Sequence, residues 1–372
     1  MRLRLRVLSG RRMALRGIAA IAMTAIGMVA APGRAQGQAA SSASSCAPCH
    51  REQAMNQAQT PMGRALMLPA TNPTLKANPK LTAHRGPYTY SIETQGEKST
   101  YSVTDGKQTI SFPIRWNFGV GVQAWIFERD GRFLESLVSY YPDSHGLELT
   151  VGDEHLKPQS LEEAVGRDLS QDDLKQCFGC HATNAVSNGR LALDSLQPGV
   201  TCEHCHAGSN IHLLDAIGGS FASAPARLGN MSAEDVSNFC GQCHRTWETV
   251  VRNHWHGEAN VRFAPYRLAN SKCFDGADAR ISCLACHDPH KNLITQASAY
   301  DAKCLACHAA GTSPSASSSL PPGGDASRAK TCPVAKAECV TCHMPKVKLP
   351  DENVTFTDHQ IRVVRAGEGY PN

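Results

Sequence analysis

The feature that most constrains this chain is a pentapeptide, Cys-x-x-Cys-His, which occurs seven times among 372 residues. One copy could arise by chance or form half of a zinc site, but structural zinc does not need histidine directly after every second cysteine. Seven copies that all end in histidine match the c-type haem attachment signature, in which both thiols bond to the haem vinyl groups and the imidazole binds iron. The sequence therefore predicts seven covalently bound haem c groups.

We number the motifs 1 to 7 in chain order. The cysteines predicted to bind haem are Cys46, Cys49, Cys177, Cys180, Cys202, Cys205, Cys240, Cys243, Cys283, Cys286, Cys304, Cys307, Cys339 and Cys342. The predicted proximal iron ligands are His50, His181, His206, His244, His287, His308 and His343. Six motifs lie between residues 177 and 343, and this density leaves little room for an ordinary hydrophobic core.

The other histidines are candidates for the second axial ligand of each iron. His204 lies inside motif 3, where it is poorly placed to reach over its own haem. In order of preference we expect His290, His359 and His212, then His145 and His155, then His84, and one of His254 and His256, which are two residues apart. Met62 is an alternative ligand for the first haem, whose potential it would raise. Any single candidate can instead be an ordinary surface histidine.

The N-terminus predicts export. Residues 1–16 contain six arginines and no acidic residue, and a short apolar run, Gly17 to Ala31, follows. This pattern is typical of a secretory signal peptide, with the mature chain starting between about Gln36 and Ala40. An uncleaved membrane anchor is the alternative, although the run is short for a spanning helix. Because haem is attached after export, we expect a Sec-type route and a periplasmic or extracellular protein.

The charge balance gives no indication of nucleic-acid binding. Seven of the 37 lysines and arginines lie at or before Arg34, so the rest of the chain carries 30 basic and 33 acidic residues. The formal charge of +4 is thus a property of the signal segment. We expect redox proteins as partners, such as other cytochromes or a membrane quinol-linked complex, and membrane contact only through an uncleaved signal segment.

Between motifs 1 and 2 the pattern changes to alternating strands. Residues 87–94, 99–105, 108–116 and 122–141 are rich in Tyr, Thr, Val and Ile and are separated by glycine-containing turns. We expect an antiparallel β unit of five or six strands at 84–151, without haem.

Two short helices are predicted after this unit. Ser160 and Ser170 are N-cap candidates, and each is followed three residues later by an acidic residue, Glu163 or Asp173. A loop rich in serine and proline is expected at 312–327.

The expected fold class is α+β, with a small antiparallel β unit and a mainly α and loop multihaem domain in which the haems stack. The predicted segments are a signal peptide at 1–35, a first haem-binding segment at 36–83, the β unit at 84–151 and a six-haem cytochrome domain at 152–372. Cys273 and Cys332 lie outside the motifs. In an exported chain we expect them to form a disulfide, with two free thiols as the alternative.

From Cys177 onward the sequence resembles a known class. The segments GVTCEHCHAGSNIH, RFAPYRLANSKCF leading to CLACHDPH, and CVTCHMPK followed by FTDHQIR are similar to the doubled-CXXCH multihaem cytochromes c. That class includes tetrahaem electron carriers of nitrifiers and hydroxylamine-oxidoreductase-like enzymes. The resemblance covers residues 177–372 and implies covalent haem with mostly bis-His ligation, but no particular substrate. Pentahaem nitrite reductases are also similar, yet their active haem uses a CxxCK motif, and all seven motifs here end in histidine.

The sequence favours an exported heptahaem electron carrier over an enzyme with its own substrate, and no catalytic residue is predicted. One alternative is an oxidoreductase that acts on a small nitrogen or sulfur compound at one haem with an open iron site. Another is a cytochrome subunit that docks to a larger redox complex through the β unit.

Overall fold

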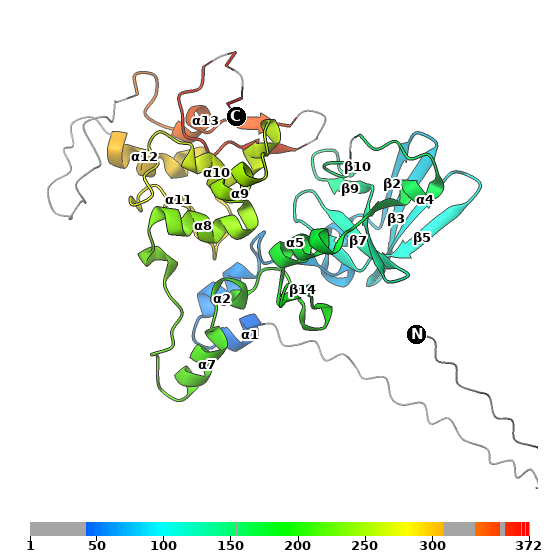
Figure 1. Ribbon diagram of the computed structural model, residues 1–372, viewed down its shortest axis with the longest axis horizontal. Coiled ribbons are helices and arrows are strands. Elements are labelled where there is room, and N and C mark those ends of the chain that lie inside the picture. The colour runs from blue at the N-terminus through cyan, green and yellow to red at the C-terminus, as the bar shows by residue number, and fades with distance from the viewer. Residues whose placement is uncertain are drawn as a thin grey trace, which may run out of the picture. The chain divides into compact units, whose positions relative to one another are not determined.

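The computed structural model describes residues 42–153, 155–308, 332–349, 354–365, 367–368 and 370–371 (Figure 1). The predicted signal peptide, its cleavage region and the loop at 312–327 lie outside these residues. In the part of the chain that is described, no helix is long and apolar enough to cross a membrane.

Four antiparallel strands form the first sheet, in the order β2 (Lys80–Arg85), β3 (Tyr88–Gln95), β4 (Lys98–Thr104) and β5 (Thr109–Pro113). Strand β3 alternates as the sequence predicts, because Tyr88, Tyr90 and Ile92 are buried and the residues between them are not. Such alternation sends every second side chain to one face of a strand. Gly96 has φ +60°, which suits the tight turn between β3 and β4.

The second sheet has the order β1 (Leu66–Met67), β6 (Trp116–Phe118), β7 (Ala124–Arg129), β8 (Arg132–Ser136) and β11 (Gly166–Asp168). Strands β9 (Val138–Tyr141) and β10 (Gly146–Leu149) pair separately. Gly166 has φ +149°, and a Cβ there would collide with the carbonyl oxygen of Glu135 on β8. Glycine is therefore required where β11 joins the edge of this sheet.

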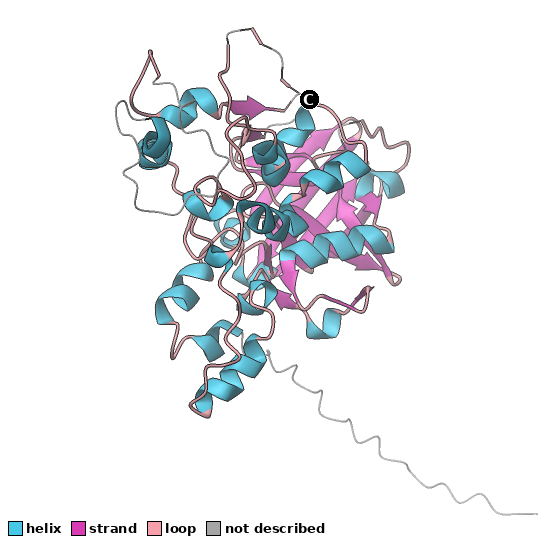
Figure 2. Cartoon of the chain, turned by 60° about the vertical axis from the view of Figure 1, so that its left-hand side comes forward, coloured by secondary structure: helices cyan, strands magenta, loops and turns pink. Residues whose placement is uncertain are grey.

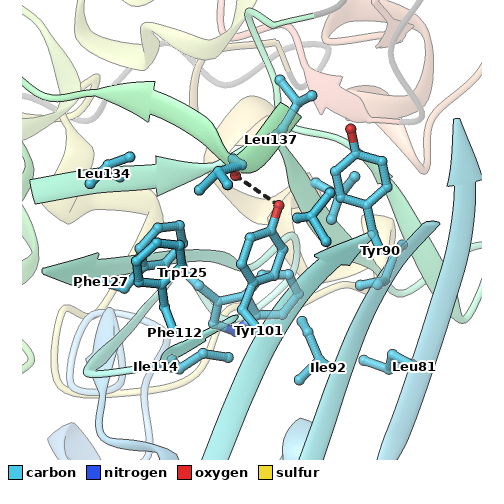
Figure 3. Close-up of a cluster of buried hydrophobic side chains, with 14 of the residues drawn as sticks. Leu81, Tyr90, Ile92, Tyr101, Phe112, Ile114, Trp125, Phe127, Leu134 and Leu137 are labelled. Carbon is cyan, nitrogen blue, oxygen red and sulfur yellow. Dashed lines mark hydrogen bonds between the residues drawn. The ribbon is translucent and has the colours of Figure 1, made fainter. Parts of the chain in front are cut away.

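A hydrophobic core joins strands of both sheets to the short helix α4 (Leu161–Val165). Tyr90, Tyr101, Trp125 and Phe127 are all fully buried in it (Figure 3). The Tyr101 hydroxyl donates to the carbonyl of Val165 at 2.8 Å, so its burial leaves that polar group paired. Burying an aromatic side chain of this kind stabilises a fold by about 1.5–3 kcal/mol.

Helix α5 (Gln171–His181) packs onto the second sheet and ends in motif 2. Its Phe178 meets the rings of Trp116 and Phe118 edge-on, at centroid distances of 5.2 and 5.1 Å. Leu174 is buried in the same cluster. One face of α5 therefore belongs to the β unit, while the end of the helix carries haem-binding residues.

The remaining elements are mostly helices, and α8 is the longest of them at 12 residues (Figure 2). Helices early in the chain are α1 (Ser42–Cys46), α2 (Arg51–Gln57), η1 (Pro69–Thr71) and α3 (Pro73–Ala77). After α5 come β12 (Ala182–Thr183), β13 (Val186–Ser187), β14 (Arg190–Leu191), η2 (Leu193–Ser195), β15 (Gln197–Pro198), α6 (Cys202–Cys205), α7 (Ser209–Ile217), η3 (Leu228–Asn230), α8 (Ala233–His244) and α9 (Trp247–Arg252). The last are η4 (Glu258–Arg262), α10 (Ala264–Ala269), α11 (Cys283–Cys286), η5 (Ala297–Tyr300), α12 (Asp301–His308), α13 (Cys339–His343), β16 (Lys346–Lys348) and β17 (Thr355–Thr357).

The predicted α+β class is confirmed, and so are both helix N-caps. The Ser160 side chain accepts from the Glu163 N–H, and Ser170 forms a reciprocal capping box with Asp173. The expected strand number was too low, since nine strands, β2 to β10, lie between Lys80 and Leu149. The additional strands are β2, which begins before residue 84, β6, which is separate from β5, and β9 and β10. Strand β9 arises because residues 122–141, which were expected to form one hairpin, break again after Ser136 and contribute three strands.

Candidate haem-binding sites

Each motif folds as a helical turn, which brings its three functional side chains together. The His206 N–H donates to the Cys202 carbonyl at 2.8 Å, and the His287 N–H donates to the Cys283 carbonyl at 2.8 Å. Residues i, i+3 and i+4 share one face of a helix. Two thiols and one imidazole of a motif can therefore approach the same porphyrin, which is the physical reason for the Cys-x-x-Cys-His spacing.

Backbone carbonyls orient three of the imidazoles. Nδ1 of His181 lies 3.0 Å from the Ala65 carbonyl, and Nδ1 of His343 lies 2.8 Å from the Arg362 carbonyl. In the same way, Nδ1 of His359 lies 3.0 Å from the Thr357 carbonyl. A carbonyl oxygen only accepts, so each Nδ1 carries the proton and donates. The other nitrogen, Nε2, then has a free lone pair, as in histidines that bind metals.

Three proximal histidines face a second imidazole. The rings of His206 and His290 are nearly parallel, with centroids 6.1 Å apart and an interplanar angle of 5°. His50 lies 6.4 Å from His212.

The third pair is His287 and His359, with ring centroids 6.3 Å apart. A metal–imidazole bond is about 2 Å long and the ring centre lies roughly 1 Å beyond the nitrogen, so two imidazoles on one metal have centres about 6–6.5 Å apart. The spacing of all three pairs fits an iron atom bound between the rings.

These three partners are the distal candidates that the sequence ranked first, His290, His212 and His359. Because His212 occupies the position facing His50, the alternative of Met62 at the first haem is not supported.

The lower-ranked candidates lie elsewhere, and none of them makes a ring contact with a motif histidine among the described residues. His84 is exposed on β2, an edge strand, and its Nδ1 lies 2.9 Å from the Thr89 hydroxyl. His145 occupies the exposed turn between β9 and β10. His155, His254 and His256 are also exposed. The expectation that His84, His145, His155 and His254 bind iron therefore gains no geometric support, because none of them faces a motif histidine among the described residues.

Cysteines of different motifs approach one another. A hydrogen bond from Cys243 of motif 4 lowers the pKa of Cys180 of motif 2 to about 7. In the same way, a hydrogen bond from Cys240 of motif 4 lowers the pKa of Cys283 of motif 5 to about 7. Motif 4 is thus adjacent to both motif 2 and motif 5.

The ends of the motif series are joined in the same way. Burial raises the pKa of Cys46 of motif 1 to about 11, and the adjacent Cys202 of motif 3 contributes. Cys304 of motif 6 interacts with Cys339 of motif 7. Sites in contact at their thiols would place porphyrin edges close together, a geometry that favours electron transfer between haems.

Weaker electrostatic interactions between cysteines connect motif 3 to motif 4 and motif 5 to motif 6. Cys205 of motif 3 influences the pKa values of Cys240 and Cys243 in motif 4, and both are raised. Cys286 of motif 5 contributes to the raised pKa of Cys304 in motif 6, where burial is the larger cause. Every motif is therefore linked to at least one other.

The surfaces around the motifs also fit haem. On α7, which carries His212, the side chains of Ile211, Leu214 and Ile217 are 56%, 70% and 78% exposed. An apolar helix face of this kind generally needs a covering partner. A porphyrin held by these motifs would supply apolar surface, and its iron would find the nitrogen donors that haem requires. The residues present therefore fit the group.

The two remaining cysteines do not form the expected disulfide, because both Cys273 and Cys332 are free thiols. Burial raises the pKa of Cys273, and Cys307 of motif 6 contributes, so this thiol lies near a haem motif. The Cys332 sulfur accepts the Ala335 N–H at 3.5 Å. Each thiol thus has its own local surroundings, and the alternative of two free thiols describes the structure.

Sequence reasoning missed the groups that orient the imidazoles. The acceptors are backbone carbonyls of Ala65, Thr357 and Arg362. Because every residue has a backbone carbonyl, the residue type does not identify such an acceptor. It also missed Phe118, whose ring lies 5.4 Å from that of His181.

Comparison with known proteins supports the same chemistry. A family model described as cytochrome c554 and c-prime matches residues 145–207, which include motifs 2 and 3. A crystal structure of an outer cell wall cytochrome, OcwA, is similar with a TM-score of 0.50 and 14% identity, covering 86% of this chain and 79% of that one. At this identity the likeness concerns the fold. No curated protein sequence matches the chain. The seven motifs, the partial family match and the shared fold together support a multihaem c-type cytochrome that transfers electrons.

Proposed function

We propose that this protein is an exported carrier that moves electrons through seven covalent haems, most of them with two histidine ligands. The observation that carries the proposal is the set of three facing imidazole pairs, whose spacing suits iron. Each haem supplies one-electron redox chemistry when bound, while the chain sets its potential through ligands, burial and hydrogen bonds. The partners are redox proteins of the same exported compartment.

The contacts between cysteines suggest an order for the haem sites. Motif 1 contacts motif 3, and motif 3 lies next to motif 4. From motif 4 the contacts continue to motif 5, then to motifs 6 and 7. Motif 2 branches from motif 4. This order makes motif 4 the junction, with motifs 1, 2 and 7 as ends where electrons enter or leave.

The three ends differ in their surroundings. Cys49 and His50 of motif 1 are exposed, as is Cys342 of motif 7. Burial lowers the pKa of His181 in motif 2, and this imidazole lies against the Phe118 ring of the β unit. Motifs 1 and 7 are therefore better suited to direct contact with partner proteins than motif 2.

The test combines haem counting with spin-state spectroscopy on the mature full-length protein. Intact mass and the alkaline pyridine spectrum should give seven haems per chain, and the oxidised protein should be mainly low-spin. Fewer than six haems on fully matured protein would contradict the count. A mainly high-spin spectrum would contradict bis-His ligation.

The order is tested by removing one haem at a time. Changing both cysteines of motif 4 to alanine should interrupt electron transfer between the motif 1 and motif 7 ends. The rate is measured with the protein bound to an electrode, as the rate at which it reduces a soluble acceptor. The same change in motif 2 is the matched control and should leave the end-to-end rate nearly unchanged. Equal loss in both variants would contradict a branch at motif 4.

A second candidate function is reduction or oxidation of a small nitrogen or sulfur compound at one haem with an open iron site. The observation that favours it is the contact of His181 with Phe118, where the described residues place no facing imidazole at the spacing of the three pairs. It predicts a high-spin signal from one haem and turnover of nitrite, hydroxylamine or tetrathionate. An all-low-spin protein without turnover would exclude this candidate.

A further inference from the structure

The segment that carries His359 is held by side chains of α10, which lies about 90 residues earlier in the chain. Arg267 is 1% exposed and Asp358 is 0% exposed. The guanidinium is bidentate on the carboxylate, since Nε donates to Oδ1 at 2.9 Å and Nη2 donates to Oδ2 at 3.0 Å. Two parallel bonds of this kind fix orientation as well as distance.

The same guanidinium reaches the residue on the other side of His359. Its Nη2 donates to Oε1 of Gln360 at 2.6 Å. Its Nη1 donates to the Pro371 carbonyl at 2.8 Å, and its carbon lies 4.4 Å from the centre of the Tyr370 ring. Arg267 therefore binds both sequence neighbours of His359 and the C-terminal residues.

The end of α10 adds backbone contacts. Ser271 Oγ accepts the Ile361 N–H at 2.8 Å, and Gln360 Nε2 donates to the Asn270 carbonyl at 3.1 Å. On the preceding side, the Asp358 N–H donates to the Pro345 carbonyl at 2.9 Å. The backbone of His359 is thus fixed on both sides, while its ring is turned by the Thr357 carbonyl toward His287, 6.3 Å away.

A buried ion pair generally gives no more stability than a well-packed apolar pair of the same volume, because both charges lose their hydration. Its clearest effect is geometric, since a planar fork accepts only one arrangement of its partners. In this chain the arrangement that it selects is the one that presents the His359 imidazole to motif 5.

We propose that Arg267 is the positioning residue that holds His359 as the distal ligand of the motif 5 haem. The inference rests on the proposed bis-His ligation and adds the side chain that maintains it. Arg267 touches neither the iron nor the imidazole; it acts through Asp358 and Gln360.

The experiment uses the full-length, haem-loaded protein and five variants. His359→Ala removes the ligand itself. Arg267→Met with Asp358→Leu replaces the buried pair by apolar side chains. Arg362, whose Nη1 lies 3.1 Å from Asp358 Oδ2, loses its carboxylate partner in this variant, so Arg362→Met alone is measured beside it. Arg267→Lys keeps a cation opposite Asp358 but cannot contact the carboxylate and Gln360 as a fork. Arg132→Met with Asp168→Leu removes a 3.0 Å ion pair between β8 and β11 and is the control.

The readouts are the number of covalent haems, the high-spin fraction of the oxidised protein and carbon monoxide binding after reduction. We expect seven haems in every variant. His359→Ala should convert about one haem in seven to a high-spin, carbon-monoxide-binding form, and the apolar double variant should do the same. Arg267→Lys should give a fraction between those of the parent and His359→Ala, and the β-sheet control should match the parent.

Several outcomes would overturn the inference. If the apolar double variant carries seven haems and its spectrum overlays that of the parent, Arg267 has no positioning role. If the double variant does not mature, Arg267→Lys decides. An Arg267→Lys spectrum identical to that of the parent would also show that Arg267 has no positioning role. If His359→Ala itself leaves every haem low-spin, the assignment of His359 fails, and this result identifies the proposed ligation as the error.

Discussion

The β unit and the cytochrome segment after residue 200 differ in how far the protein itself buries their large apolar side chains. In the β unit, Trp125 and Phe127 have no exposed surface, and aromatic rings stack between strands. In the cytochrome segment, Leu214 and Ile217 are mostly exposed. Both hydrophobic clusters found in the described residues consist of residues before Val200.

The two regions therefore depend on different partners for stability. Backbone hydrogen bonds and apolar side chains close the β unit without any other molecule. The later region has short helices, few large buried side chains and five motifs, so covalent porphyrins are expected to provide much of its apolar contact. Folding of the second region is therefore expected to be coupled to haem attachment, as metal binding is coupled to folding elsewhere.

The largest effect should follow from preventing haem attachment. Chain produced without the signal segment, in cells that do not attach haem, should keep a protease-resistant fragment that contains β2 to β11. Residues after α5 should be digested rapidly, because they lack a core of their own. Limited proteolysis with mass spectrometry measures this difference.

The haem-loaded protein is the control for that experiment and should resist digestion in both regions. Equal resistance of both regions in the haem-free chain would show that the cytochrome segment folds without haem.

A smaller effect is expected from a cavity in the β unit. Phe127→Ala removes a fully buried ring that stacks on Phe112 at 4.7 Å and on Tyr101 at 5.2 Å. Substitutions of this type cost about 3–5 kcal/mol of unfolding free energy. Denaturant unfolding followed by hydrogen exchange in β3 to β8 should show the loss, while the haem spin state should not change. A changed haem spectrum would mean that the two regions are not separable.

In the cytochrome segment, removal of a single iron ligand should change the spin state of one haem without a large change in the free energy of unfolding. His290→Ala removes the imidazole that faces His206 and should turn about one haem in seven high-spin. His84→Ala is the matched control, because the imidazole of this exposed histidine contacts the Thr89 hydroxyl and faces no motif histidine among the described residues. Absorption and magnetic resonance spectra check both variants. A spectral change in His84→Ala, or none in His290→Ala, would reverse our assignment of ligands.

The sequence was informative where chemistry is tied to residue type. Seven copies of Cys-x-x-Cys-His together predict haem attachment, and Ser170 followed by Asp173 predicts a helix start. The α+β class could also be predicted, because alternation in residues such as Tyr88, Tyr90 and Ile92 is a local property of a strand.

What sequence did not reveal depends on long-range contacts. Eight histidines were available as distal ligands, and only the fold distinguishes His212, which faces motif 1, from His84 on a strand edge. The pairing of Arg267 with Asp358 joins positions that local pattern cannot connect. The expected disulfide between Cys273 and Cys332 failed for a related reason, because elimination identifies unassigned cysteines but gives no distance between them.

The smallest predicted effect concerns α5, the helix that belongs to both regions. Ser170 Oγ accepts the Asp173 N–H at 3.1 Å, and the Asp173 carboxylate accepts from the Ser170 N–H at 3.1 Å. Ser170→Ala should cost about 1 kcal/mol, the usual value for a lost N-cap. Hydrogen exchange in residues 171–181 should rise in this variant. Ser160→Ala, which uncaps α4, a helix packed against the core of the β unit, is the control and should leave that exchange unchanged.

The effect of the α5 cap should depend on pH in a defined direction. Hydrogen bonding from Ser170 lowers the pKa of Asp173 below its ordinary value of 3.8. A carboxylate with a depressed folded pKa stabilises the fold above its unfolded pKa and loses that contribution as pH falls through the folded pKa. The parent and Asp173→Asn should therefore differ at neutral pH and converge in acid below that range. A difference that grows in acid would show that the Asp173 charge does not stabilise α5, and the link between the β unit and motif 2 would have to lie in the packing of Phe178 instead.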